Sequence, residues 1–124
     1  MQEEQHRVLV VDDEPDVRLV LSSLLSLEDF TVRCAADGTE AIDEARSFEP
    51  HVVLMDVMMP GIGGLEATRE IRRGAPDLPI VLLSARTSGA DQELGRAAGA
   101  VDFITKPFEP ADLVERLKAA ISAA

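Results

Sequence analysis

Short apolar runs alternate with amphipathic stretches along nearly the whole chain. Three of the runs are unbroken and all five are too short for a helix, so we expect strands of a parallel sheet that is covered on both faces. The five expected strands are Val8–Val11, Phe30–Ala35, Val52–Met55, Ile80–Leu83 and Val101–Thr105. Between them, apolar side chains recur at helical spacing, which predicts a helix after every strand.

The first expected helix, Pro15–Leu27, has clear boundary signals. Pro15 suits a first helical turn, and Asp13 is expected to cap the helix. The inward stripe of this helix is expected to be Val17, Val20, Leu21, Leu24 and Leu25. The other helices are expected from the turn Asp37-Gly38 to Pro50, over Leu65–Ile71, up to Gly99 with Leu94, Ala97 and Ala98 as its apolar residues, and over Ala111–Ile121.

Strands that alternate with helices favour an α/β fold in which helices cover both faces of a parallel sheet. Five such units are too few for an eight-stranded barrel, so we expect an open, doubly wound, five-stranded parallel sheet with five helices. No linker or low-complexity segment divides the chain. Residues 1–124 are therefore expected to form a single domain, with its core at about residues 7–122.

Composition restricts the partners and the compartment. The 23 acidic residues against 12 basic ones give a formal charge of −11, which argues against direct binding of nucleic acid. A single cysteine, Cys34, excludes an internal disulfide and fits a reducing compartment. The stretch Met1–Arg7 is polar, unlike a signal peptide, and no apolar run approaches the roughly 18 residues that cross a bilayer. We therefore expect a cytoplasmic protein that does not contact the membrane.

Chemically capable residues follow four of the five expected strands. Asp12 and Asp13 follow the first strand, Asp56 the third, Ser84 the fourth and Lys106 the fifth. Each alone has an ordinary explanation, since Asp and Ser cap helices and a lysine after an edge strand is commonly solvated. However, the carboxyl ends of parallel strands share one edge, and ligands bind there in open α/β sheets. Together these residues predict a site at that edge.

Three carboxylates at one edge would repel one another, so at least one should have a raised pKa. A cation would relieve the repulsion, and all-oxygen ligands suit magnesium, or manganese in its place. His6 and His51 precede strands and belong to the opposite edge, so neither is expected to be a ligand or a base. With a cation bound, a carboxylate beside an ammonium and a hydroxyl could attack a phosphoryl group in line.

Four segments carry a family resemblance. They are Val10-Val11-Asp12-Asp13-Glu14, Leu54-Met55-Asp56-Val57-Met58-Met59-Pro60-Gly61, Leu83-Ser84-Ala85 and Phe103-Ile104-Thr105-Lys106-Pro107-Phe108. In this order and at these separations they resemble the receiver domain of bacterial response regulators, from about residue 7 to residue 121. The resemblance implies a flavodoxin-like sheet with strand order 2-1-3-4-5, which chemotaxis receivers also have.

The resemblance also implies roles in handling phosphate. Asp56 would be the phosphorylated residue, Lys106 would contact the phosphate, and the Ser84 hydroxyl would hydrogen-bond to it and take part in the switch. Phe103 would be the aromatic switch residue, which can rotate inward but lacks the hydroxyl of the tyrosine that is also common there. The bond between Lys106 and Pro107 would be cis.

A set of metal ligands is implied in the same way. Asp13 would bind magnesium directly and Asp12 through water. Asp56 and the backbone carbonyl of Met58 would complete the protein's share of the ligands, with the Met58 side chain at the mouth of the pocket.

The implied function is that of a phosphoacceptor in a two-component phosphorelay, which catalyses only its own phosphorylation and dephosphorylation. The donor would be a histidine kinase or a histidine phosphotransferase. The phosphorylated form would control an output domain or a downstream protein, with a phosphorylation-dependent dimer as one active form.

Three alternatives can be weighed on single features. A haloacid dehalogenase-like aspartyl-phosphate hydrolase needs an acid–base Asp two residues after its nucleophile, where this chain has Met58. A flavin-binding flavodoxin-like domain needs a phosphate-binding loop after the first strand, where Asp12-Asp13-Glu14 would repel phosphate. A degenerate receiver used only for interaction would not need the full set of acidic residues and Lys106.

Overall fold

The computed structural model describes residues 5–86 and 88–124, which form five strands and five helices in alternation. The strands are β1 Arg7–Val11, β2 Thr31–Ala35, β3 Val52–Asp56, β4 Ile80–Ser84 and β5 Asp102–Thr105. The helices are α1 Pro15–Leu27, α2 Gly38–Phe48, α3 Gly64–Gly74, α4 Gly89–Ala98 and α5 Pro110–Ala123. None of the helices in these ranges is both long and apolar enough to cross a membrane. Of the polar stretch at the N-terminus, residues 1–4 lie outside the described residues.

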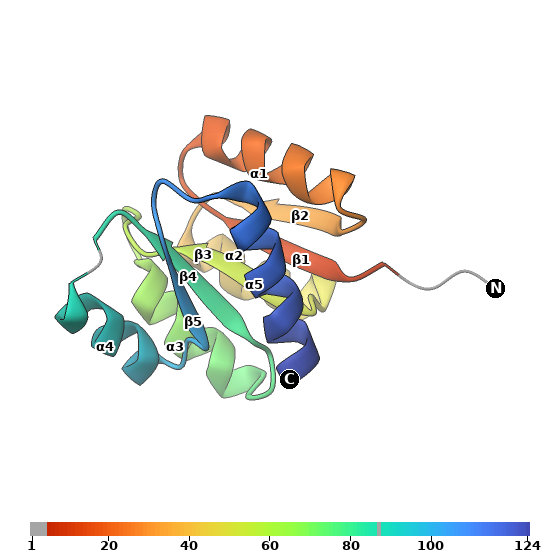
Figure 1. Ribbon diagram of the computed structural model, residues 1–124. Coiled ribbons are helices and arrows are strands. Elements are labelled where there is room, and N and C mark those ends of the chain that lie inside the picture. Colours follow the sequence, from red (N-terminus) through yellow and green to blue (C-terminus); the bar gives the residue numbers. More distant parts are fainter. Residues whose placement is uncertain (1–4, 87) are drawn as a thin grey trace.

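The strands form one parallel sheet in the order β2-β1-β3-β4-β5 (Figure 1). The order reverses between β1 and β3, which is the switch point of a doubly wound sheet. Both the fold class and the implied strand order are therefore confirmed. The inner strands β3 and β4 are buried along their whole length, which explains their continuous apolar sequences.

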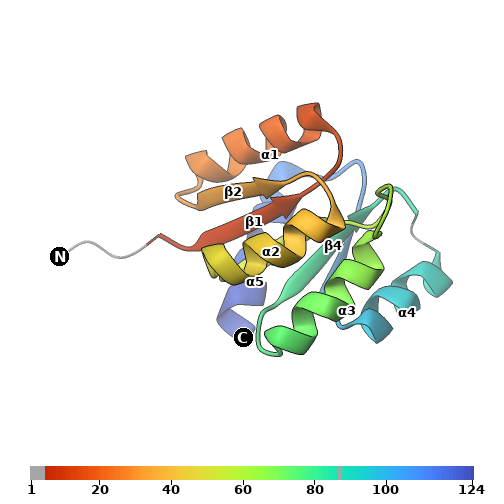
Figure 2. The same cartoon turned by 180° about the vertical axis from the view of Figure 1, so that it is seen from behind.

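Two hydrophobic cores lie on the two faces of the sheet. Helices α1 and α5 cover one face, and α2, α3 and α4 cover the other (Figures 1 and 2). Strand β1 shows the division, because Val8 and Val10 belong to the first core and Leu9 and Val11 to the second. The apolar run of β1 is unbroken because alternate side chains of this strand pack into opposite cores.

Four apolar residues that were expected inside are exposed: Val20, Leu94, Ala97 and Val101. Val20 precedes the buried Leu21 by one residue, which turns it about 100° around the helix and away from the sheet. In α4 the residue that faces the sheet is Gly95 rather than Leu94, so α4 approaches the sheet through its backbone. Val101 lies just before β5 rather than within it.

Candidate functional site

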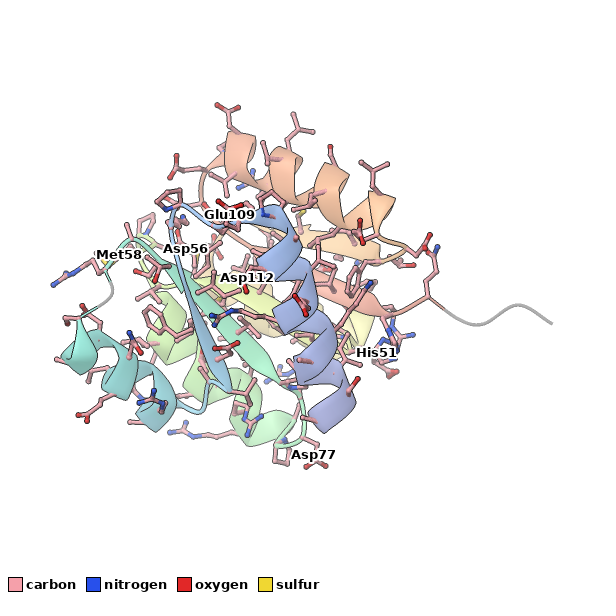
Figure 3. All side chains as sticks on the ribbon, in the orientation of Figure 1. His51, Asp56, Met58, Asp77, Glu109 and Asp112 are labelled. Atoms are coloured by element: carbon pink, nitrogen blue, oxygen red, sulfur yellow. The ribbon has the colours of Figure 1, made fainter. Side chains whose placement is uncertain are left out.

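The carboxyl ends of β1, β3, β4 and β5 bring polar residues together at one edge of the sheet. Asp56 and Ser84 are the last residues of β3 and β4, and Asp12 and Lys106 directly follow β1 and β5. Asp12, Asp56 and Ser84 are 1%, 5% and 1% exposed, and each has a hydrogen-bond partner, as buried polar groups require. Asp56 lies at this end of the molecule and His51 at the other (Figure 3).

Three carboxylates form the acidic cluster, which is defined by Asp12, Asp13 and Asp56. One oxygen of each lies within 4.8 Å of the other two, and Asp13 is more open to solvent than its neighbours. Burial, followed by the charge of Asp12, raises the pKa of Asp56 to about 6, and the charge of Lys106 opposes this rise. The predicted raised pKa is thus confirmed. Crowded, oxygen-only donors whose repulsion a cation would relieve fit a magnesium ion.

Lys106 bridges two members of the acidic cluster. Its Nζ lies 3.3 Å from Oδ2 of Asp12 and 3.6 Å from Oδ1 of Asp56, and its side chain is only 23% exposed. The backbone N–H of Lys106 donates to the Ser84 carbonyl oxygen at 2.8 Å, and the following bond to Pro107 is cis. Lys106 is therefore not the freely solvated lysine that is common after an edge strand. Its ammonium group instead offsets part of the negative charge of the site.

Ser84 and Phe103 lie on neighbouring strands of the sheet. Ser84 is paired in register with Thr105, two residues along β5 from Phe103. The Ser84 hydroxyl accepts a hydrogen bond from the Arg86 N–H at 3.0 Å, and an accepting hydroxyl still has its own proton to donate. The Phe103 ring is half-buried against α4, where a Cβ on Gly95 would lie 3.2 Å from its Cδ2.

Residues 57–63 form the β3–α3 loop, which leaves the site directly after Asp56. The Met58 N–H donates to Oδ1 of Asp56 at 3.3 Å, and the Met58 side chain is exposed at the mouth of the site. Figure 3 shows Met58 at the same end of the molecule as Asp56. The backbone of Met58 therefore lies next to the acidic cluster.

The prediction that Asp13 caps α1 is wrong. The residue at the N-cap is Glu14, and no side chain caps this helix end. Instead, Oδ1 of Asp12 accepts a hydrogen bond from the Glu14 N–H at 2.9 Å. Asp13 thus keeps its carboxylate for the acidic cluster.

One residue of the site was missed in the sequence. Arg18 of α1 donates from its guanidinium to the backbone carbonyl of Asp12 at 2.7 Å. Side chains on a helix lean toward its N-terminus, so an arginine one turn into α1 can reach the preceding loop. This direction is a signal that could have identified Arg18. The contact fastens α1 to the loop that carries the acidic pair.

The doubly wound parallel sheet, with three carboxylates and a lysine at the carboxyl edge of its strands, places the protein in the class of flavodoxin-like α/β folds. A family model described as the response regulator receiver domain matches residues 8–118. The chain belongs to this family and is a receiver domain of two-component response regulators.

Solved structures agree with this assignment. The chemotaxis protein CheY4 of Vibrio cholerae is 33% identical with a TM-score of 0.90, over 94% of this chain and 98% of that one. A putative response regulator of Chloroflexus aurantiacus is 35% identical with a TM-score of 0.90, over 95% and 98%. NtrX of Brucella abortus is 32% identical with a TM-score of 0.88, over 94% of this chain but only 27% of that one. These comparisons give no support to the hydrolase alternative.

Proposed function

We propose that Asp56 accepts a phosphoryl group from a phosphohistidine of a histidine kinase or a histidine phosphotransferase. The observation that carries this proposal is a buried carboxylate at the end of β3, held between Asp12 and Lys106. Because burial raises the pKa of Asp56 to about 6, the group is more basic than an ordinary aspartate. It is still about 90% ionised at pH 7, as a nucleophile must be.

The acidic cluster and the backbone carbonyl of Met58 would hold a magnesium or manganese ion. Asp13, which is the most open of the three carboxylates, would bind it directly, and Asp12 through water. When bound, the ion supplies positive charge that offsets the repulsion of the carboxylates and the charge on the phosphoryl oxygens.

In the transfer step, a carboxylate oxygen of Asp56 attacks phosphorus and forms an O–P bond. The P–N bond to the donor's histidine breaks, and its electron pair leaves with the imidazole. Lys106 stabilises the negative charge on the phosphoryl oxygens, for which its place 3.6 Å from Asp56 is suited. The Ser84 hydroxyl then donates a hydrogen bond to a phosphate oxygen.

Phosphorylation would be read out through the strand next to the site. As the Ser84 hydroxyl turns to the phosphate, Phe103 on β5 rotates inward from its half-buried position against α4. That rotation changes the surface of α4 and β5, which an output domain, a downstream protein or a second copy of the domain would recognise. Among the similar proteins the match covers 27% of NtrX but 98% of CheY4, so such a domain occurs both within a longer chain and as nearly the whole of one.

The proposal also covers the extent of the domain, its location and its catalytic scope. Residues 1–124 would act as one domain with its core at about residues 7–122, in the cytoplasm. The domain would catalyse only its own phosphorylation and dephosphorylation, because Met58 stands where a hydrolase would need an acid–base group.

The experiment is phosphorylation by a small acyl phosphate such as acetyl phosphate, followed by intact mass measurement. With magnesium present, the protein should gain one phosphoryl group, and hydroxylamine should remove it, because an acyl phosphate is labile to that nucleophile. Asp56→Asn should gain none. Asp77→Asn is the matched control, since Asp77 is exposed at the far end of the molecule (Figure 3). Equal labelling of Asp56→Asn and the wild type would refute the proposal.

A further inference from the structure

The first residue of α2, Gly38, packs so closely against the β3–α3 loop that there is no room for a side chain. Gly38 is buried, and a Cβ added to it would lie 2.5 Å from the backbone oxygen of Ile62 and 2.9 Å from its Cγ2. No real Cβ atom tolerates such contacts, and one of the two atoms belongs to the backbone. The loop could therefore not take its present course past any other residue at this position.

The start of α2 is held firmly, so a side chain there would displace the loop rather than the helix. The Asp37 carboxylate accepts from the Glu40 N–H at 2.8 Å, which caps the helix. The Glu40 carboxylate accepts in turn from the Ala36 N–H at 3.2 Å. These two hydrogen bonds fix the position of Gly38 relative to β2.

The other end of the loop is fixed on the site itself. The Gly64 N–H donates to the Val57 carbonyl oxygen at 3.0 Å, and a Cβ on Gly64 would overlap the carbonyl oxygen of Asp56. The Val57 N–H donates to the Leu83 carbonyl oxygen at 3.2 Å. Between these anchors, Met58 and Ile62 lie on one short segment, so a displacement at Ile62 is transmitted toward Met58.

We propose that Gly38 is a positioning residue for the cation site. It seats Ile62 against α2 and thereby sets the course of the loop, including the carbonyl of Met58 and the N–H that Met58 donates to Asp56. This inference rests on the proposed function, because it needs the acidic cluster to bind a divalent cation. It means that cation binding also depends on a residue of α2 that does not itself contact the cation.

The test is the magnesium affinity of Gly38→Ala, measured by isothermal titration of chelator-treated protein. Loss of support for a ligand commonly weakens metal binding by about tenfold or more, so the dissociation constant should rise about tenfold. Gly74→Ala is the matched control, since a Cβ at Gly74 meets nothing within 4 Å. Its affinity should equal that of the wild type. Urea unfolding in chelator reports separately on the stability of each variant.

The outcomes separate a positioning role from a structural one. A Gly38→Ala protein that is less stable but binds magnesium as tightly as the wild type overturns the inference. If Gly38→Ala does not fold, Ile62→Gly loosens the same contact from the loop side and should also raise the dissociation constant about tenfold. An unchanged constant there overturns the inference equally. A wild type that binds no magnesium overturns the metal site of the proposed function, and this inference with it.

Discussion

Opposing influences meet at the carboxylate of Asp56. Burial is the largest and raises its pKa, and the charge of Asp12 adds to the rise. The ammonium group of Lys106 and the N–H of Met58 act against them, and the result is a pKa of about 6. In the unfolded chain this group has an ordinary pKa near 3.8. Ionised Asp56 therefore lowers the stability of the metal-free fold.

This loss has a defined pH window. Between pH 3.8 and about 6 the native protein binds more protons at Asp56 than the unfolded chain does, so its contribution to stability falls as the pH rises and stays low above that window. In chelator at pH 7, Asp56→Asn should be more stable than the wild type by about 3 kcal/mol. Urea unfolding should show the difference shrinking toward pH 4. A difference of the same size at both pH values would contradict this account.

The α4 helix depends on its termini more than on packing. Only small residues of α4, Gly95 and Ala98, are buried, and a Cβ on Gly95 would meet Leu82 of β4 and the half-buried Phe103 ring of β5. A capping box begins the helix. The Ser88 hydroxyl accepts a hydrogen bond from the Asp91 N–H at 3.1 Å, and the Asp91 carboxylate accepts one from the Ser88 N–H. Gly99, with a φ of 112°, ends it. A helix held in this way would be free to shift if Phe103 rotates as proposed.

Removing the cap should therefore loosen α4 alone. Ser88→Ala should cost this helix about 1 kcal/mol, which native-state hydrogen exchange would detect as faster exchange of its amides. The pKa of Asp91, which the Ser88 hydroxyl holds below its ordinary value, should rise in the same variant. Ser23→Ala on the exposed side of α1 is the control and should change neither quantity. Unaltered exchange in α4 would show that packing, not the cap, maintains it.

Across the whole molecule, folding and cation binding should be linked. Three carboxylates are gathered at one edge of a domain that already carries a formal charge of −11, so the metal-free fold includes repulsion that an ion would relieve. An ion that binds only the native state stabilises it by mass action. Stability should therefore depend on magnesium through the acidic cluster.

Asp13→Asn tests this linkage because it removes one charge without disturbing a helix cap. In chelator the variant should be more stable than the wild type, since the remaining carboxylates repel less. If the wild-type dissociation constant is about 1 mM, about 10 mM magnesium should add roughly 1.4 kcal/mol to the wild type and much less to Asp13→Asn. Thermal or urea unfolding with and without the ion measures both effects, and Asp77→Asn serves as the control. A variant that is less stable in chelator yet responds fully to magnesium would mean that Asp13 is structural.

The order of the elements and the edge that carries the site followed from local patterns. A strand buried on both faces needs a continuous apolar run, and the residue after it marks the carboxyl end. Because all parallel strands end at the same edge, Asp12, Asp56 and Lys106 could be brought together without knowing any contact between them. The strand order itself was not local information and came from the family resemblance.

Contacts between distant segments were decided only by the tertiary structure. Periodicity could not show that Gly95 rather than Leu94 would face the sheet, since that depends on how closely α4 approaches Phe103. Nor could it show that Gly38 would seat Ile62, because the turn dipeptide Asp37-Gly38 has a sufficient local explanation. Periodicity and turn propensity arise from neighbours along the chain and can be read there. Close packing depends on the shapes of surfaces that meet only when the chain is folded.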